Sequence, residues 1–219
     1  MKTVLSWSGG KDSALALYYA KKDPNIEIIS ILTTITEHYE RISMHGVKKE
    51  LLEEQSKQLG VPLELIYIPT DSSNEIYNSI MEGKMLELKK NGINSVIFGD
   101  IFLEDIRAYR ENNLSKIGMN AHFPLWKQST EKLTHEFIDL GFKAIITCID
   151  SEFLDKSFIG REFNKDFIAD LPEEVDLCGE NGEFHTFVYD GSLFENSVTF
   201  NLGKVEFRDN RFYFKDLMI

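Results

Sequence analysis

The first 120 residues alternate short apolar runs with helix-forming segments, and no other feature restricts the fold as strongly. The apolar, β-prone runs cover residues 3–7, 26–32, 63–68 and 95–98. The helix-forming segments cover residues 12–23, 47–59 and 75–90. Strands that alternate with helices predict a Rossmann-like α/β fold, in which a parallel sheet carries helices on both faces. Ligands bind such sheets beyond the carboxyl ends of the strands, so functional residues are expected there.

The alternation weakens after about residue 120. The next expected elements are a helix at 131–140, a strand at 144–149, a segment of mixed helical character at 152–171 and a polar loop at 178–183. β-prone runs at 198–202, 205–207 and 211–214, with Asp209-Asn210 at a turn, predict a small antiparallel ribbon. The sequence therefore divides into a domain of residues 1–120 and a smaller α+β subdomain of residues 121–219.

The charge and cysteine content exclude several classes of protein. The chain carries 24 Lys and Arg against 36 Asp and Glu, a net charge of −12. A surface of this sign does not attract nucleic acid or an anionic membrane, so neither DNA nor a membrane is an expected partner. No apolar run approaches the length of a membrane span, and no secretion signal is recognisable. Cys148 and Cys178 lack metal or disulfide spacing, which indicates reduced thiols in a cytoplasmic protein.

The strongest chemical signal is the turn after the first expected strand, Ser8-Gly9-Gly10-Lys11-Asp12-Ser13. Two glycines let the backbone approach a bulky anion, and the amide N–H groups at the start of the next helix face that anion. The lysine adds positive charge, and the serine hydroxyls are further donors. The spacing is neither a Walker A loop nor a dinucleotide fingerprint, which disfavours common kinases, GTPases and dehydrogenases. It predicts a polyphosphate site; a polar strand-to-helix turn without function is the alternative.

The same turn resembles the pyrophosphate loop (PP-loop) of the N-type ATP pyrophosphatases, whose HUP-type domains split ATP between its α and β phosphates. Longer motifs are similar to one branch, the diphthine–ammonia ligase family, over essentially the whole chain. These motifs are Trp7 to Leu17, Ser43 to Gly46, Phe98 to Ile101 with Glu104, Asp105 and Arg107, Phe123 to Trp126, Gly141 to Ala144, Gly160-Arg161 and Cys178 to Phe187. The last of them, with its Gly-Glu-x-Gly-Glu-Phe block, is far more specific than the phosphate loop.

The resemblance implies an ATP-dependent amide ligase with an ATP-binding PP-loop domain followed by a substrate-binding subdomain. Members of the branch use ATP and ammonium to convert the carboxylate of diphthine, a modified histidine on translation elongation factor 2, into an amide. ATP and Mg²⁺ are the implied cofactors. Asn181 and His185 stand where eukaryotic and archaeal members tend to carry Gly and Glu. A different carboxylate, such as a small molecule of cobalamin metabolism in a bacterium, is therefore an open alternative acceptor.

Ten residues are expected to bind the nucleotide: Ser6, Ser8, Gly9, Gly10, Lys11, Asp12, Ser13, Thr33, Met44 and His45. The phosphate loop would hold the β and γ phosphates. Asp12 would orient a Mg²⁺ ion held mainly by phosphates, unless it only caps the helix. Ser6, Thr33 and the Met44-His45 turn follow the first two strands and would contact the adenosine. A structural hydroxyl and a core methionine are the alternatives.

Six residues are expected to act on the acceptor and on ammonia: Asp100, Asp105, Arg107, Glu180, Glu183 and His185. Asp100 and Arg107 would orient the activated carboxylate, and nearby carboxylates would bind ammonium and accept its proton. Glu183 or His185 would transfer protons. Charged residues at a helix start commonly complement the helix dipole only, which is the alternative for Glu104. A histidine between phenylalanines is often structural.

Two other functions use the same phosphate loop. A tRNA thiolase needs a sulfur-carrying cysteine and a basic RNA-binding face, and the net charge disfavours the second. A nucleotide-binding sensor would keep the loop and perform no chemistry. The sequence shows no glutaminase nucleophile, so ammonia is expected from solution or from a separate protein. Assembly into a homo-oligomer is left open.

Overall fold

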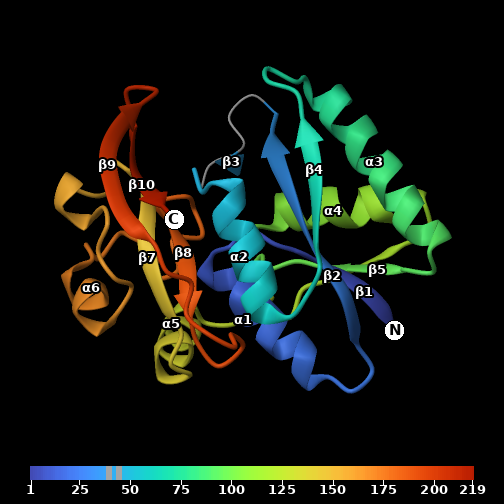
Figure 1. Cartoon of the computed structure of the whole chain (residues 1–219), viewed down its shortest axis with the longest axis horizontal. Helices are drawn as coiled ribbons and strands as arrows, with labels where there is room; N and C mark the ends of the chain where they lie inside the picture. Colours follow the sequence, from blue (N-terminus) through green and yellow to red (C-terminus); the bar gives the residue numbers. More distant parts are fainter. Residues whose placement is uncertain (38–40, 43–45) are drawn as a thin grey trace.

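The computed structural model describes residues 1–37, 41–42 and 46–219, which form two sheets side by side (Figure 1). The first sheet contains the parallel strands β1 (Lys2–Ser6), β2 (Glu27–Thr36), β4 (Leu63–Ile68), β5 (Ser95–Ile97) and β6 (Asn120–His122). Their order is β4-β2-β1-β5-β6, and the short strand β3 (Arg41–Ile42) pairs antiparallel with the end of β2. This arrangement confirms the predicted α/β class.

Helices cover both faces of the parallel sheet. These helices are α1 (Lys11–Lys22), α2 (Lys49–Leu59), α3 (Asn74–Lys90) and α4 (Glu104–Lys116). Neighbouring residues of a strand point to opposite faces. Leu5 of β1 joins the buried cluster that contains residues of α1 and α2, whereas Val4 joins the cluster that contains residues of α3 and α4. The continuous apolar runs seen in the sequence are therefore strands buried on both sides.

The second sheet is antiparallel, with the order β8-β7-β10-β9. Its strands are β7 (Lys143–Asp150), β8 (Phe184–Asp190), β9 (Asn201–Arg208) and β10 (Phe212–Met218). Helix α5 (Thr130–Asp139) precedes β7. The predicted ribbon is β9 and β10, and Asp209 and Asn210 turn between them with positive φ angles of 53° and 52°.

Several details differ from the sequence prediction. The runs predicted at 198–202 and 205–207 form one strand, β9, which begins only at Asn201, and the short strand β3 was not among the predicted elements. The segment at 152–171 contains only a 3₁₀ turn (Lys156–Phe158) and the short helix α6 (Lys165–Asp170). Residues Phe184–Asp190 form strand β8, where the sequence analysis predicted no strand. Strand β6 was not expected, because three residues of the type Asn-Ala-His carry no β-prone pattern, and it runs across the expected division between residues 120 and 121.

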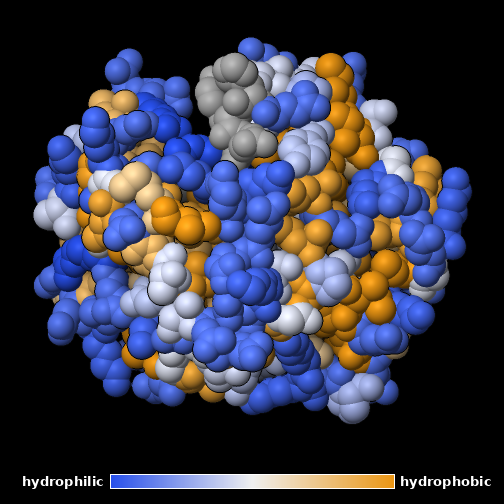
Figure 2. Space-filling model, in the orientation of Figure 1, coloured by the Kyte–Doolittle hydropathy of each residue, from blue (hydrophilic) through white to orange (hydrophobic). Residues whose placement is uncertain are grey.

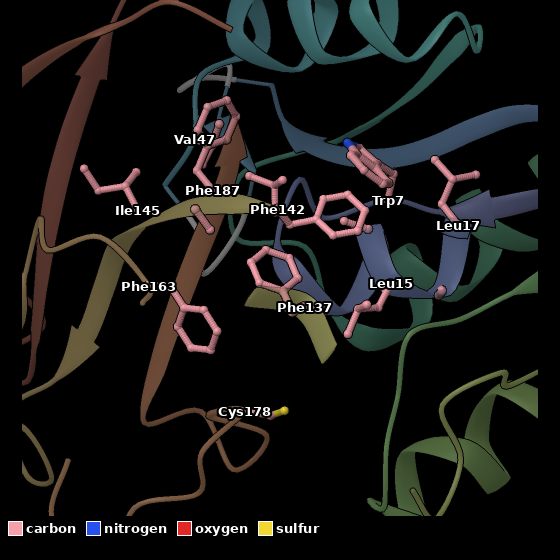
Figure 3. Close-up of a cluster of buried hydrophobic side chains, with 14 of the residues drawn as sticks. Trp7, Leu15, Leu17, Val47, Phe137, Phe142, Ile145, Phe163, Cys178 and Phe187 are labelled. Carbon is pink, nitrogen blue, oxygen red and sulfur yellow. The ribbon is translucent and has the colours of Figure 1, made fainter. Parts of the chain in front are cut away.

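One hydrophobic core joins the two sheets. Helices α1 and α2 lie between the sheets (Figure 1), and the same buried cluster contains Leu15 of α1 and Phe187 of β8. Aromatic rings of the C-terminal half pack at its centre, where Phe137 stacks on Phe142 at 5.1 Å and meets Phe163 edge-on at 5.6 Å (Figure 3). The start of α1 is therefore held against residues of the second sheet.

The outer surface is mixed in character. Figure 2 shows hydrophilic residues over much of one face, with hydrophobic residues reaching the surface mainly on the side of β4 and α3. Exposed apolar side chains there include Ile76 and Leu86 of α3. Within the described ranges, none of the helices is long and apolar enough to cross a membrane.

Candidate active site

The glycine loop lies at the carboxyl end of β1, directly before helix α1. Gly10 is the N-cap residue of α1, has an extended backbone and offers no side chain of its own to cap the helix. Gly9 has a φ angle of +77°, and a Cβ atom added there would lie 2.9 Å from Oε1 of Gln55. The loop therefore requires glycine at this position, and it presents the positive end of α1 to a ligand.

Two serines shape the loop. The Ser13 hydroxyl donates to the carbonyl oxygen of Gly10 at 2.8 Å. The Gly10 amide donates to Oγ of Ser8 at 3.3 Å, and the two serine oxygens are 3.3 Å apart. The structure thus brings Ser8 and Ser13 together at the loop, as the sequence predicts for side chains that assist phosphate binding.

Strand β8 holds the loop from the other half of the chain. The amide of Val188 donates to the carbonyl oxygen of Gly9 at 2.8 Å. The amide of Lys11, the first residue of α1, donates to the Thr186 hydroxyl at 3.0 Å. The edge of the antiparallel sheet is thus bonded directly to the predicted phosphate site.

Gln55 adds a third connection that sequence reasoning missed. This α2 residue is fully buried, and its amide group donates to the carbonyl oxygens of Gly9 at 3.0 Å and Val188 at 2.6 Å. Its own oxygen accepts from the indole of Trp7 at 2.9 Å. The sequence does contain a sign of this role, because Gln55 lies three residues after Leu52 on the otherwise apolar face of α2.

Lys11 turns away from the cavity described below and faces the C-terminal half. Its side chain is buried, with Nζ 2.7 and 2.8 Å from the carboxylate oxygens of Asp12. Nζ also lies 5.9 Å from the ring centre of Phe163 and 5.7 Å from that of Phe184. Burial lowers the pKa of Lys11. The negative charge of Asp12, with contributions from Cys178 and Glu180, outweighs the effect of burial and raises the pKa overall. Burial raises the pKa of Asp12, and Lys11 only partly offsets this.

Glu180 connects the loop at 176–183 to the end of β5. Its Oε1 accepts hydrogen bonds from the amides of Ile101 at 2.7 Å and Phe102 at 3.3 Å. Burial raises the pKa of Glu180 to about 7, with a further upward contribution from the Asp12 charge. A carboxyl group that titrates near neutral pH beside the glycine loop is suited to general acid–base chemistry.

Glu183 orders the loop from within. It is buried, and its carboxylate accepts from the Asp176 amide at 3.1 Å. Asn181 donates to it twice, from its backbone at 3.0 Å and from its side chain at 2.9 Å. Asn181 thus holds the carboxylate of Glu183 from both its backbone and its side chain.

A cavity of about 430 Å³ opens beside the glycine loop, between the parallel sheet and helices α3 and α4. Four of the predicted site residues line it: Ser6, Ser8, Thr33 and His185. Its inner part is apolar, with Met81 and Met85 of α3 and Leu114 of α4. The volume and this division between a polar rim and an apolar interior suit a nucleoside. Met44 and His45 lie outside the described residues.

The residues after β5 separate into two groups. Asp100 and Arg110 form a two-point ion pair, with Oδ1 3.1 Å from Nη2 and Oδ2 3.0 Å from Nε. Arg110 lines the cavity, and sequence reasoning missed it. Arg107 pairs instead with Glu111 at 2.7 Å. Asp105 is exposed in the first turn of α4.

Close packing explains why Asp100 lies near the glycine loop. A Cβ atom added at Gly99 would lie 2.9 Å from the backbone carbon of Asp12 and 3.1 Å from the Ser13 nitrogen. The glycine therefore allows the end of β5 to approach the start of α1. Thr33 has a structural bond at the neighbouring strand, since its hydroxyl donates to the Trp7 carbonyl oxygen at 2.6 Å.

Neither cysteine has the environment of a nucleophile. Cys148 and Cys178 are both buried and unpaired by disulfides, and burial is the main cause that raises each pKa to about 12. A thiolate is therefore disfavoured at both positions near neutral pH. Over the described part of the chain, His, Cys, Asp and Glu form no group of three or more that could hold a metal ion.

Two family models match the chain. Residues 1–121 match the diphthamide synthase N-terminal domain, and residues 129–215 match the diphthamide synthase C-terminal domain. A diphthine–ammonia ligase of Mus musculus is 27% identical over 144 residues, which cover 64% of this chain and 54% of that protein. The Saccharomyces cerevisiae protein of the same name is 25% identical over 232 residues, which cover 90% of this chain and 34% of that protein.

The chain spans about half the length of the mouse relative and about a third of the yeast one. Among solved structures, the U34-tRNA thiolase NcsA from Methanococcus maripaludis with its 4Fe-4S cluster is 13% identical, with a TM-score of 0.38 over 64% of this chain and 56% of that one. That similarity is too weak to indicate a shared activity.

Proposed function

The chain belongs to the diphthamide synthase family, and from this premise we propose that it is an ATP-dependent amide ligase that releases AMP and pyrophosphate. One observation carries the proposal. The glycine loop opens onto a nucleoside-sized cavity on one side and is bonded to strand β8 on the other. A nucleotide bound there would have its phosphates next to Glu180, a carboxyl group with a pKa of about 7.

The reaction consists of two displacements. An oxygen of the acceptor carboxylate attacks the α phosphorus of ATP, the bond to the bridging oxygen breaks, and pyrophosphate departs. The nitrogen of ammonia then attacks the acyl carbon, and AMP leaves with the former carboxylate oxygen. The start of α1 would hold the departing pyrophosphate, because its amides and helix dipole favour negative charge. Glu180 would take a proton from ammonium, which makes the nitrogen nucleophilic.

The side chains at the loop also fit a magnesium ion. The hydroxyls of Ser8 and Ser13 are hard oxygen donors at the glycine loop, and Asp12 would add a carboxylate if it exchanged its ion pair with Lys11 for the metal. Mg²⁺ prefers such donors and takes most of its remaining ligands from phosphates and water. Bound there, the ion would neutralise the charge that develops on the departing pyrophosphate.

The acceptor is a carboxylate, either diphthine on an elongation factor or a small molecule. The name of the relatives supports the first. The presence of Asn181 and His185 in this loop supports a different acid, because the resemblance leads us to expect Gly and Glu at these positions. The buried cysteines weigh against sulfur transfer, since each thiol has a pKa of about 12.

Product analysis tests the proposal. Purified protein is incubated with ATP, Mg²⁺, ammonium and candidate acids, among them elongation factor 2 that carries diphthine. We expect AMP and pyrophosphate in equal amounts, and only when a suitable acid is present. Release of ADP would rule out the proposed chemistry. ATP binding without turnover against any acid would favour the sensor.

A further inference from the structure

Two arginines lie three positions apart on α4 and have different surroundings. Arg107 pairs with Glu111, and its guanidinium lies 4.6 Å from the ring centre of Trp126. Arg110 lines the cavity that begins at the glycine loop. Only the second is therefore in a position to meet a ligand bound in that cavity.

Arg110 is held in place by two contacts. Its Nη2 donates to Oδ1 of Asp100 at 3.1 Å, and its Nε lies 3.0 Å from Oδ2 as an ion pair without a hydrogen bond. The ring of Phe98, another residue of the cavity wall, lies 4.3 Å from the guanidinium carbon. A guanidinium has five N–H donors in a rigid fork, and one carboxylate occupies one edge of it. The remaining donors are thus pre-positioned for a second anion.

An anion in this cavity needs a positive partner, because the chain has a net charge of −12. Lys11 is not this positive partner, because its ammonium group pairs with Asp12 and faces two phenylalanine rings of the C-terminal half. Among the charged residues that line the cavity, Glu82 is negative and Lys116 is exposed in the last turn of α4. Arg110 is the fixed cation of the described lining residues.

We propose that Arg110 binds the α-phosphate of the nucleotide, the phosphate that remains on AMP. This assignment rests on the proposed function. With the outer phosphates at the start of α1 and the nucleoside in the cavity, the α-phosphate lies at the junction, next to Ser8 at the cavity rim. Arg110 and the glycine loop then recognise different parts of ATP: the arginine recognises the AMP part, and the loop recognises the pyrophosphate part.

Separate binding of the two products tests this division. The dissociation constants of AMP and pyrophosphate are measured by calorimetry for the wild type, Arg110→Gln and Arg110→Lys. We expect Arg110→Gln to weaken AMP binding about tenfold to hundredfold, the usual effect of losing charged hydrogen bonds. Pyrophosphate binding should change less than about twofold. Arg110→Lys keeps the charge but loses the fork, so it should give an intermediate loss for AMP.

A matched control comes from the second sheet. Arg211 also pairs with a buried aspartate, with Nε 2.8 Å from Asp150, and it stacks on Phe212 at 5.4 Å. Arg211→Gln should therefore disturb the fold in a similar way while leaving AMP binding unchanged. The double variant Asp100→Asn, Arg110→Gln removes the carboxylate that the single variant leaves unpaired. It should recover thermal stability without recovering AMP binding.

The outcomes separate this inference from the function on which it rests. If the wild type binds neither ATP nor AMP, both fail. If the wild type binds AMP and Arg110→Gln binds it within twofold, only the assignment of Arg110 fails. An equal loss of AMP and pyrophosphate binding, or recovered AMP binding in the double variant, also overturns the assignment.

Discussion

The parallel sheet and the antiparallel sheet contribute to the glycine loop in different ways. The parallel sheet carries the loop at the end of β1, together with the cavity beside it. The antiparallel sheet bonds to the loop through Thr186 and Val188 of β8, and Glu180, in the segment before β8, bonds to the backbone that follows β5. Lys11 and Thr186 are 175 positions apart in the chain. The half that carries the glycine loop therefore does not hold it in place alone.

The largest effect is expected at Glu180, the residue through which the C-terminal half would take part in the proposed reaction. If Glu180 takes a proton from ammonium, Glu180→Gln should lower turnover by a factor of about a hundred or more. Gln keeps an acceptor for the Ile101 amide, so ATP affinity should stay within about twofold. Steady-state kinetics and calorimetry measure the two effects. Unchanged turnover in Glu180→Gln would show that Glu180 takes no part in the reaction and that the C-terminal half only stabilises the loop.

The pH dependence of turnover and of stability provides a second test of the role of Glu180. With a pKa of about 7, Glu180 becomes a carboxylate above neutral pH, so turnover at equal ammonium should rise between about pH 6 and pH 8. The folded pKa lies above the usual value of 4.5, so the folded state binds more protons in this range. The free energy of unfolding should therefore fall as the pH rises from about 4.5 to 7. Glu180→Gln should remove both effects; a parallel pH response in this variant would contradict them.

The next largest effect concerns the contact between the halves. Gln55→Leu leaves the Trp7 indole and the Gly9 carbonyl without their buried partner, which should cost about 3 kcal/mol of unfolding free energy. Urea denaturation measures it. Gln58→Leu on the same helix is the control for an exposed contact, because Gln58 is only partly buried, donates to Glu54 and accepts from the Asn196 amide at an exposed position. Equal stability of the two variants would show that the buried bonds of Gln55 stabilise the contact between the halves no more than an exposed bond does.

The parallel sheet could be predicted from the sequence better than the antiparallel sheet. The alternating pattern predicts the parallel sheet well, because strands buried on both faces produce long apolar runs and helices end at recognisable residues such as Gly60, with a φ angle of +63°. The glycine loop and its place at the end of β1 also follow from local sequence.

Long-range contacts are what local sequence does not contain. Thr186, Gln55 and Arg110 are ordinary residues of a strand and two helices until the fold brings them to the loop and the cavity. Asp100 was expected beside Arg107, since both follow β5, but the turn of α4 places Arg110 against it. Strand β8 was missed for the same reason, because its partners lie at β7 and at the glycine loop.

A smaller effect is expected where the second sheet gives one hydrogen bond. Thr186→Val keeps the shape of the side chain but removes the acceptor of the Lys11 amide, so it should lower the unfolding free energy by about 1–2 kcal/mol. Thr147→Val in β7 is the control, since its hydroxyl lies 3.4 Å from the His185 carbonyl and makes a weaker bond. A larger loss from Thr147→Val would contradict this ranking.

The smallest effect should come from a contact within the exposed surface. Lys127 pairs with Glu104 at 3.1 Å, and both side chains are largely exposed. Such pairs are screened by water, so Lys127→Ala should change the unfolding free energy by less than about 0.5 kcal/mol. A thermal melt beside the wild type measures it. A loss of unfolding free energy as large as that of Thr186→Val would show that this exposed ion pair stabilises the protein as much as the bond between Lys11 and Thr186.

The transfer of oxygen tests the central claim most directly. An acceptor acid whose carboxylate carries ¹⁸O is incubated with the protein, ATP, Mg²⁺ and ammonium, and the AMP released is analysed by mass spectrometry. If the carboxylate attacks the α phosphorus, each AMP should carry one ¹⁸O atom, and the pyrophosphate should carry none. Unlabelled AMP beside a newly formed amide, or label in any phosphate released with ADP, would contradict the account.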